Sequence, residues 1–141
     1  MYTSLFYDFI LGEDNLRVYE GGELIFSSDK ENLIPWLEYI RLFYPYVSRA
    51  IVFDKILGNA AALLAVKAGC RNIYSPLGSR PAVSTLEKYH IKYQIINIVP
   101  FIRQDGDSEM CYLEKLSLGQ HPDEFFESVR HRLISEEYLG R

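Results

Sequence analysis

Hydrophobic and polar positions along this chain change their period several times, and each change marks the boundary of a predicted element. Apolar residues three and four positions apart predict helices, whereas alternating or continuous short apolar runs predict strands. Helices are predicted over residues 2–11, 32–44, 55–68 and 80–90, with a last helix from Pro122 to about Ile134. Strands are predicted over residues 16–20, 23–28, 49–53, 71–75 and 93–99.

Glycine and proline residues set several of these boundaries. Gly21 and Gly22 separate two alternating runs, and because glycine tolerates positive φ, they predict a two-residue hairpin loop. Gly12, Pro45 and Gly69 are expected to end the helices that precede them.

Two helices also carry signals for where they start. Asn32 is the expected cap of helix 32–44, with Pro35 in the first turn, and Pro81 lies in the first turn of helix 80–90. The remaining segments are connections: a turn over residues 76–79, a polar loop over 100–110, and a segment over 111–119 that fits either a short strand or a helix.

The order of the elements predicts an α/β fold. After an opening pair of strands, helices and strands alternate, and right-handed crossovers then yield one mixed sheet covered on both faces. We therefore expect a three-layer α/β/α sandwich with a mixed sheet of about five strands. No linker or repeat interrupts the 141 residues, so residues 1–141 are expected to form a single domain.

Composition excludes several functional classes. A formal net charge of -4, with scattered Lys and Arg, argues against nucleic acid as a partner. The chain starts without a basic segment and has no long apolar run, so we expect a cytoplasmic protein that does not enter a membrane. The two cysteines, Cys70 and Cys111, form no CxxC motif, and neither a disulfide framework nor a zinc ribbon is indicated.

Aromatic residues make up 14% of the chain, and the first and last helices carry them on more than one face. Such residues are enriched where one protein covers another. A homodimer is therefore expected.

The junction at residues 53–59 is the first candidate site. Asp54 and Lys55 follow an apolar strand, and ligands in open α/β sheets bind outside the carboxyl ends of strands. These two side chains could bind a polar ligand or transfer a proton, and Gly58 and Asn59 could let a ligand approach the helix backbone. Alternatively, Asp54 caps the helix and Lys55 extends to solvent.

The next strand-to-helix junction carries Ser75, Gly78, Ser79 and Arg80. Hydroxyl groups, amides and a guanidinium at such a place could hold a phosphate or a carboxylate. The alternative is ordinary turn and capping chemistry.

Cys111 is the thiol with charged neighbours in sequence, Glu114 and Lys115. A nearby lysine can lower a thiol pKa and make the thiol reactive, although a lone cysteine is more often a buried small residue. Glu114 is also included among the expected ligand-binding residues.

Three segments carry a resemblance to a known family: the hairpin with its glycine turn, FDKILGNAAALLAVKAG at 53–69, and IRQDGDSEMCYLEKLSLG at 102–119. Over nearly its full length the chain resembles a small prokaryotic family of unknown function that is grouped with the cytidine deaminase-like fold. The family has no established activity to carry over.

The deaminase likeness implies a zinc site formed by an HxE or CxE motif at one helix start and PCxxC at the next. Here Ile56, Leu57 and Gly58 fall near the first motif, and Leu77 and Arg80 fall where the thiolates would stand. Leucine and isoleucine cannot bind zinc. The comparison implies no metal, no cofactor and no zinc-dependent deamination.

Three functional classes follow. The leading one is a small-molecule-binding domain that takes a nucleotide or an anionic metabolite on a zinc-free scaffold. The second is a metal-independent enzyme that uses Asp54, Lys55 or Cys111. The third is an oligomeric interaction protein, whose pocket would be filled by Ile56 and Leu77.

Overall fold

The computed structural model describes residues 2–103 and 109–138 of the chain. Its helices are α1 (Tyr2–Leu11), α2 (Ile34–Phe43), α3 (Asn59–Ala68), α4 (Arg80–Lys88), α5 (Tyr112–Ser117) and α6 (Pro122–Tyr138). Its strands are β1 (Leu16–Glu20), β2 (Glu23–Ser28), β3 (Ile51–Asp54), β4 (Ile56–Leu57), β5 (Asn72–Ser79) and β6 (Lys92–Val99). None of these helices has the length and apolar character needed to cross a membrane.

The strands form one mixed sheet. β1 pairs antiparallel with β2 and β3, whereas β3, β4 and β6 all pair parallel with β5. β3 and β4 are consecutive parts of one line, because both pair with β5 in the same register and only Lys55 separates them. The expected mixed α/β sheet is confirmed, and its six strands follow five lines.

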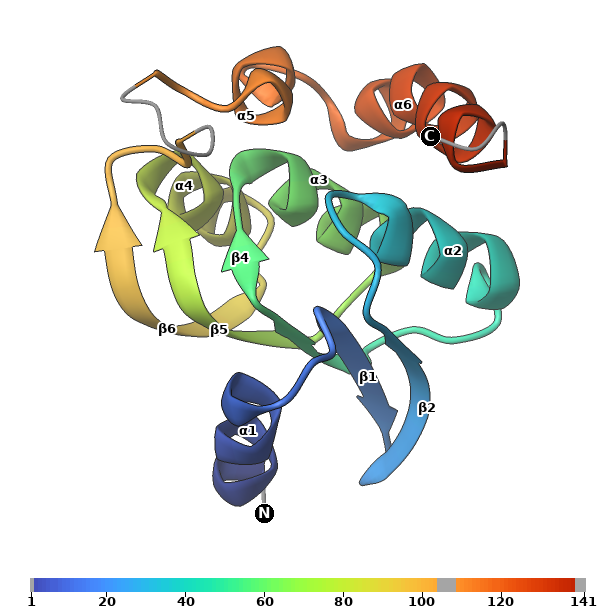
Figure 1. Cartoon of the computed structure of the whole chain (residues 1–141), viewed down its shortest axis with the longest axis vertical. Helices are drawn as coiled ribbons and strands as arrows, with labels where there is room; N and C mark the ends of the chain where they lie inside the picture. The colour runs from blue at the N-terminus through green and yellow to red at the C-terminus, as the bar shows by residue number, and fades with distance from the viewer. Residues whose placement is uncertain (1, 104–108, 139–141) are drawn as a thin grey trace.

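Helices lie on both faces of the sheet (Figure 1). On one face, α1 places Phe6 and Phe9 against Phe53 and Tyr74. On the other face, the apolar sides of α2, α3 and α4 form the larger core, and α5 and α6 pack on α3 farther from the sheet (Figure 1). This second face carries the helix starts that surround the candidate site.

Local signals located several boundaries correctly. The helix predicted over 2–11 is α1, and the two-glycine hairpin is confirmed, with φ of 59° at Gly21 and 86° at Gly22. Gly69 ends α3 with φ of 73°, and Pro81 lies in the first turn of α4. The strand predicted over 93–99 is β6.

The predicted cap of α2 is wrong. Leu33, not Asn32, is the N-cap residue, and it makes no side-chain capping bond. Asn32 instead has φ of 58°, a left-handed conformation that asparagine tolerates better than most residues. The asparagine therefore turns the chain into α2 rather than capping the helix.

Both strand-to-helix junctions also differ from the prediction. Residues 56–57 continue the strand as β4, so the helix begins at Asn59 and not at 55, and Gly58 rather than Asp54 is its N-cap residue. Residues 76–79 are the end of β5, not a turn. Pro76 cannot donate to a ladder, and the neighbouring Ser75 hydroxyl bonds both the N–H and the C=O of Leu77.

The C-terminal segments complete the second face. Residues 112–117 are a helix, α5, which decides between the two alternatives for 111–119. α6 begins at Pro122 as predicted. Residues 104–108 of the predicted polar loop lie outside the described residues.

Candidate functional site

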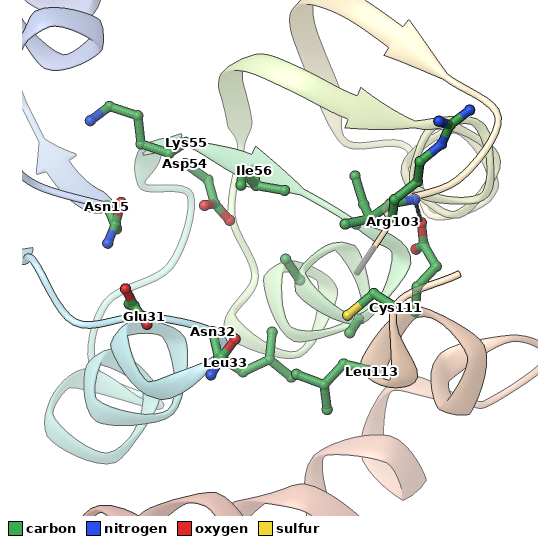
Figure 2. A pocket seen from close by; sticks show the side chains of 15 residues that line it. Asn15, Glu31, Asn32, Leu33, Asp54, Lys55, Ile56, Arg103, Cys111 and Leu113 are labelled. Atoms are coloured by element: carbon green, nitrogen blue, oxygen red, sulfur yellow. Dashed lines mark hydrogen bonds between the residues drawn. The ribbon is translucent and has the colours of Figure 1, made fainter. Parts of the chain in front are cut away.

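A pocket of about 480 Å³ opens at the carboxyl end of β3, bordered by the chain before α2 and by the starts of α3 and α5 (Figure 2). Apolar side chains form much of its wall: Leu33, Ile56, Ala60, Ala61, Ile102 and Leu113. Six ionisable side chains also line it: Glu31, Asp54, Lys55, Arg103, Cys111 and Glu114. Its size lies within the range of small-molecule sites.

Asp54 brings a buried carboxyl group to this pocket. The side chain points into the space between the elements (Figure 2), and the residue is 8% exposed. Its Oδ2 accepts a hydrogen bond of 2.7 Å from the indole Nε1 of Trp36. Burial disfavours the charged form and raises the pKa of Asp54 to about 7, although bonds from Trp36 and the Ile56 amide oppose the rise.

Lys55 lines the pocket but directs its ammonium group elsewhere. Its Nζ donates to the carbonyl oxygens of Gly12 at 2.8 Å and Asp14 at 2.9 Å, and lies 4.9 Å from the centre of the Phe9 ring. Figure 2 shows the side chain pointing away from Asp54. Consecutive strand residues point to opposite faces, so the adjacent pair in sequence is divided between the two faces.

Glu114 reaches the start of α3 from α5. Its Oε1 accepts hydrogen bonds from the Asn59 amide at 2.5 Å and the Ser79 hydroxyl at 3.2 Å, and its Oε2 accepts one from the Ile102 amide at 2.6 Å. Asn59 is the first residue of α3 and Ser79 is the N-cap of α4. A carboxylate of the chain itself thus occupies the helix start that a ligand was expected to approach.

Gly58 makes this arrangement possible. A Cβ atom at this position would lie 3.1 Å from Glu114 Oε1 and 3.1 Å from Ile102 Cγ1. Gly58 has an extended backbone with φ of -85°, so its small size, rather than unusual backbone freedom, is what the site uses. The close approach that the sequence predicted for a ligand is made here by Glu114.

The other candidates at the first junction and in β5 have structural contacts. Asn59 donates to the carbonyl and hydroxyl of Ser117 and accepts from Thr85, so it joins α3, α5 and α4. Ser75 spans Pro76, as described above. A Cβ on Gly78 would lie 2.8 Å from Ile95 Cδ1, so Gly78 allows close packing of β5 and β6.

The second junction is not part of the pocket wall. Ser79 caps α4 by accepting from the Ala82 amide and donates to Glu114, whereas Arg80 is exposed at the start of α4. Neither residue lines the pocket. Ser79 reaches the site through Glu114, and the structure does not bring Arg80 to it.

Cys111 enters the same pocket from the opposite side. The residue precedes α5, its amide donates to the Ile102 carbonyl at 2.7 Å, and its sulfur points into the space (Figure 2). The structure therefore brings Asp54, Cys111 and Glu114 to one pocket although long stretches of sequence separate them.

Several site residues were not anticipated from the sequence. Trp36 holds Asp54, and Arg103 and Glu31 lie at the pocket wall. The Trp36 bond had one available signal: helical spacing placed this tryptophan in the core, and a buried indole N–H usually finds an acceptor. Arg103 and Glu31 carried no comparable signal.

Metal-binding side chains do not gather in the described part of the chain. There, no group of three or more His, Cys, Asp or Glu residues is placed to hold a metal ion.

Leu57 is buried and Ile56 is largely exposed at the end of β4. The pocket has Ile56 on its wall and is not lined by Leu77, so the expectation that these two residues fill it is wrong.

The fold and the pocket together define an α/β protein with a mixed sheet and a small-molecule-sized site at a strand end. The family model described as TM1506, domain of unknown function (DUF1893), matches residues 10–133. The chain belongs to this DUF1893 family. Comparison with curated proteins gives no match.

A solved structure supports the same assignment. The chain is similar to a DUF1893 family protein, TM1506, from Thermotoga maritima, whose crystal structure was determined at 2.70 Å resolution. The two chains share 28% identity with a TM-score of 0.79, over 91% of this chain and 86% of the other. The resemblance noted in the sequence is confirmed at the level of this family.

Proposed function

We propose that this protein is a small-molecule-binding domain and that Asp54 is the polar centre of its binding pocket. One observation carries the proposal: a buried carboxyl group faces a pocket of small-molecule size whose wall combines apolar and polar side chains. Small-molecule sites commonly combine apolar walls with a few fixed polar groups. Trp36 fixes the carboxyl in place and leaves it further acceptor capacity.

Of the two ligand kinds expected from the sequence, a nucleoside or nucleotide fits better than a free anion. A planar base could lie between apolar walls and donate an N–H to Asp54, which accepts when ionised and can also donate when protonated. The donors at the start of α3 are already used by Glu114, and a second anion beside that carboxylate would be repelled. The guanidinium of Arg103 points away from the pocket (Figure 2), so it is not placed to bind a phosphate group of a ligand there. The proposed ligand is therefore defined by its base and does not need a phosphate group.

The cytidine deaminase-like likeness and the loss of zinc ligands belong to this proposal. They rest on the residues that fall where the metal ligands would stand: Ile56, Leu57 and Gly58 before α3, and Leu77 and Arg80 near the start of α4. Glu114 joins these two starts by bonding to the Asn59 amide and the Ser79 hydroxyl. Metal analysis of the purified protein tests this part, and stoichiometric zinc would overturn it.

Calorimetric titration tests the binding proposal. The four common ribonucleosides and their 5′-monophosphates are titrated into the wild type, Asp54→Asn and Asp8→Asn. Asp8 is exposed on α1, outside the pocket, and provides a matched control. We expect at least one base to bind, with at least tenfold weaker binding to Asp54→Asn and no change in Asp8→Asn. No binding by any of the eight compounds, or equal binding by both variants, would contradict the proposal.

A second candidate function is metal-independent catalysis. It is favoured by the presence of the Asp54 carboxyl and the Cys111 thiol in one pocket, which could serve proton transfer and nucleophilic attack. Lys55 does not fit this role because its ammonium group is held by two carbonyl oxygens. Turnover of a bound compound that is lost in both Asp54→Asn and Cys111→Ser would establish this function, and binding without turnover would exclude it for that compound.

A further inference from the structure

The outer edge of β6 is an unpaired stretch of backbone. Among the described residues, β6 pairs with β5 alone, and Figure 1 shows no labelled helix or strand beside its outer side. The strand spans eight residues, Lys92–Val99. Along such an edge, alternate residues present N–H and C=O groups that can pair with another extended chain.

The opposite edge of the sheet, β2, has features that oppose such pairing. β2 begins with Glu23 and is followed by Asp29 and Lys30, and its ladder with β1 changes register between Val18 and Tyr19. Charges and bulges are common means of protecting sheet edges. The two edges therefore differ in their capacity to accept another strand.

β6 lacks these features after its first residue. Residues 93–99 contain no charged residue, no proline and no glycine. Two large apolar side chains in this stretch are exposed, Ile96 at 60% and Ile98 at 43%. A long, uncharged edge strand with exposed apolar side chains is a surface that favours association.

The aromatic residues that first indicated a homodimer are largely used within the chain. Phe6 and Phe9 of α1 are buried against the sheet, and Phe125 of α6 is buried in the larger core. These three side chains supply no exposed surface for a second copy, although Tyr7 of α1 is exposed. The β6 edge, by contrast, is exposed.

We propose that β6 pairs with β6 of a second copy, antiparallel across a two-fold axis, so that the two sheets become one. The unpaired backbone can accept an extended strand as its partner, and the same strand in a second copy provides one by symmetry. Antiparallel pairing places the two Lys92 residues at opposite ends, roughly 20 Å apart. Because β6 carries no acidic residue, the two negatively charged chains meet there without opposed carboxylates.

Light scattering after size exclusion tests this surface in the full-length protein. We expect the wild type to have twice the mass of one chain, and Ile96→Lys or Ile98→Lys to have the mass of one chain with an unchanged circular dichroism spectrum. Leu24→Lys is the matched control, because Leu24 is 51% exposed on the β2 edge. This variant should remain dimeric.

Hydrogen exchange gives a second readout that does not depend on a variant folding well. Alternate amides of β6 should exchange at least tenfold more slowly at high than at low protein concentration, whereas β2 amides should not change. A wild type that is monomeric at all concentrations would overturn the proposal. A dimer that persists in both β6 variants, or that Leu24→Lys dissociates equally well, would also overturn it.

Discussion

The Glu114 carboxylate accepts a hydrogen bond of 2.5 Å from the amide of Asn59, the first residue of α3. The first amides of a helix have no partner within the helix, and the positive end of the helix dipole lies there. Glu114 supplies the missing acceptor and a complementary charge, and with Ser79 it connects the starts of α3 and α4. One buried side chain thus links the starts of two helices that pack on the same face of the sheet.

Removing this carboxylate should be costly. Glu114→Ala leaves the Asn59 amide, the Ser79 hydroxyl and the Ile102 amide without their acceptor. We expect the free energy of unfolding in urea to fall by about 3 kcal/mol or more. The exposed Glu13→Ala should change it by less than about 0.5 kcal/mol. Equal effects of the two variants would show that Glu114 has no structural role.

Gly58→Ala tests the close approach of Glu114 to the backbone. The added methyl group would lie 3.1 Å from Glu114 Oε1, and such overpacking costs about 1–3 kcal/mol. Part of that cost should vanish when Glu114 is already alanine, which gives a coupling of about 1 kcal/mol in a double-mutant cycle by urea unfolding. Strict additivity would contradict the predicted contact, because any loss of helix capping appears in both backgrounds and cancels.

The raised pKa of Asp54 predicts a pH dependence with a definite sign. The pKa rises from 3.8 in the unfolded chain to about 7 in the folded protein, so the folded state binds a proton that the unfolded state has lost. Between these values the stability contributed by this group falls as the pH rises, by at most about 4 kcal/mol. Below pH 3.8 both states are protonated, and above pH 7 the loss is complete.

Comparison with Asp54→Asn isolates this effect from the other carboxylates. Urea unfolding of both proteins at pH 4.5 and 7.5 should show the wild type losing stability relative to Asp54→Asn at the higher pH. Parallel pH profiles would mean that the Asp54 pKa is the same in both states. Nuclear magnetic resonance titration of the Asp54 carboxyl carbon gives the folded-state value directly.

The two cysteines should differ in their accessibility to reagents. Cys70 is buried, and burial raises the pKa of its thiol to about 12, whereas Cys111 is half-buried at the pocket. A maleimide should therefore label one thiol per native chain and two per unfolded chain, as measured by mass spectrometry. Cys111→Ser should abolish native labelling. Labelling that persists in this variant would place the accessible thiol at Cys70.

The sequence predicted those parts of the fold that depend on local chemistry. Helical spacing and Gly21-Gly22 sufficed for α1 and the hairpin, because period and positive φ are properties of short segments. The start of α3 was misplaced because Asp54 and Lys55 resemble a helix start. Pro76 and Gly78 are typical turn residues, so their place within β5, which depends on pairing with distant strands, could not be predicted from the local sequence.

The candidate site was predictable only in its position. Ligands in open α/β sheets bind at the carboxyl ends of strands. This generalisation indicated Asp54, which lines the pocket. The carboxylate that accepts a hydrogen bond from the first amide of α3 belongs to Glu114, 55 positions after Asn59. No local sequence pattern relates these two residues. Likewise, Lys55 lies on the opposite face of the strand from Asp54, so its ammonium group is not beside that carboxyl group.

The most direct test of the account uses the single tryptophan of the chain. Because Trp36 Nε1 donates to Asp54 Oδ2, the indole N–H resonance in a nitrogen-correlated spectrum reports on that carboxyl without assignment of the other signals. Titration with nucleosides should shift this resonance in the wild type with saturation, whereas Asp54→Asn should need at least tenfold higher nucleoside concentrations for the same fractional shift. A resonance that no nucleoside moves in the wild type would contradict ligand binding at Asp54.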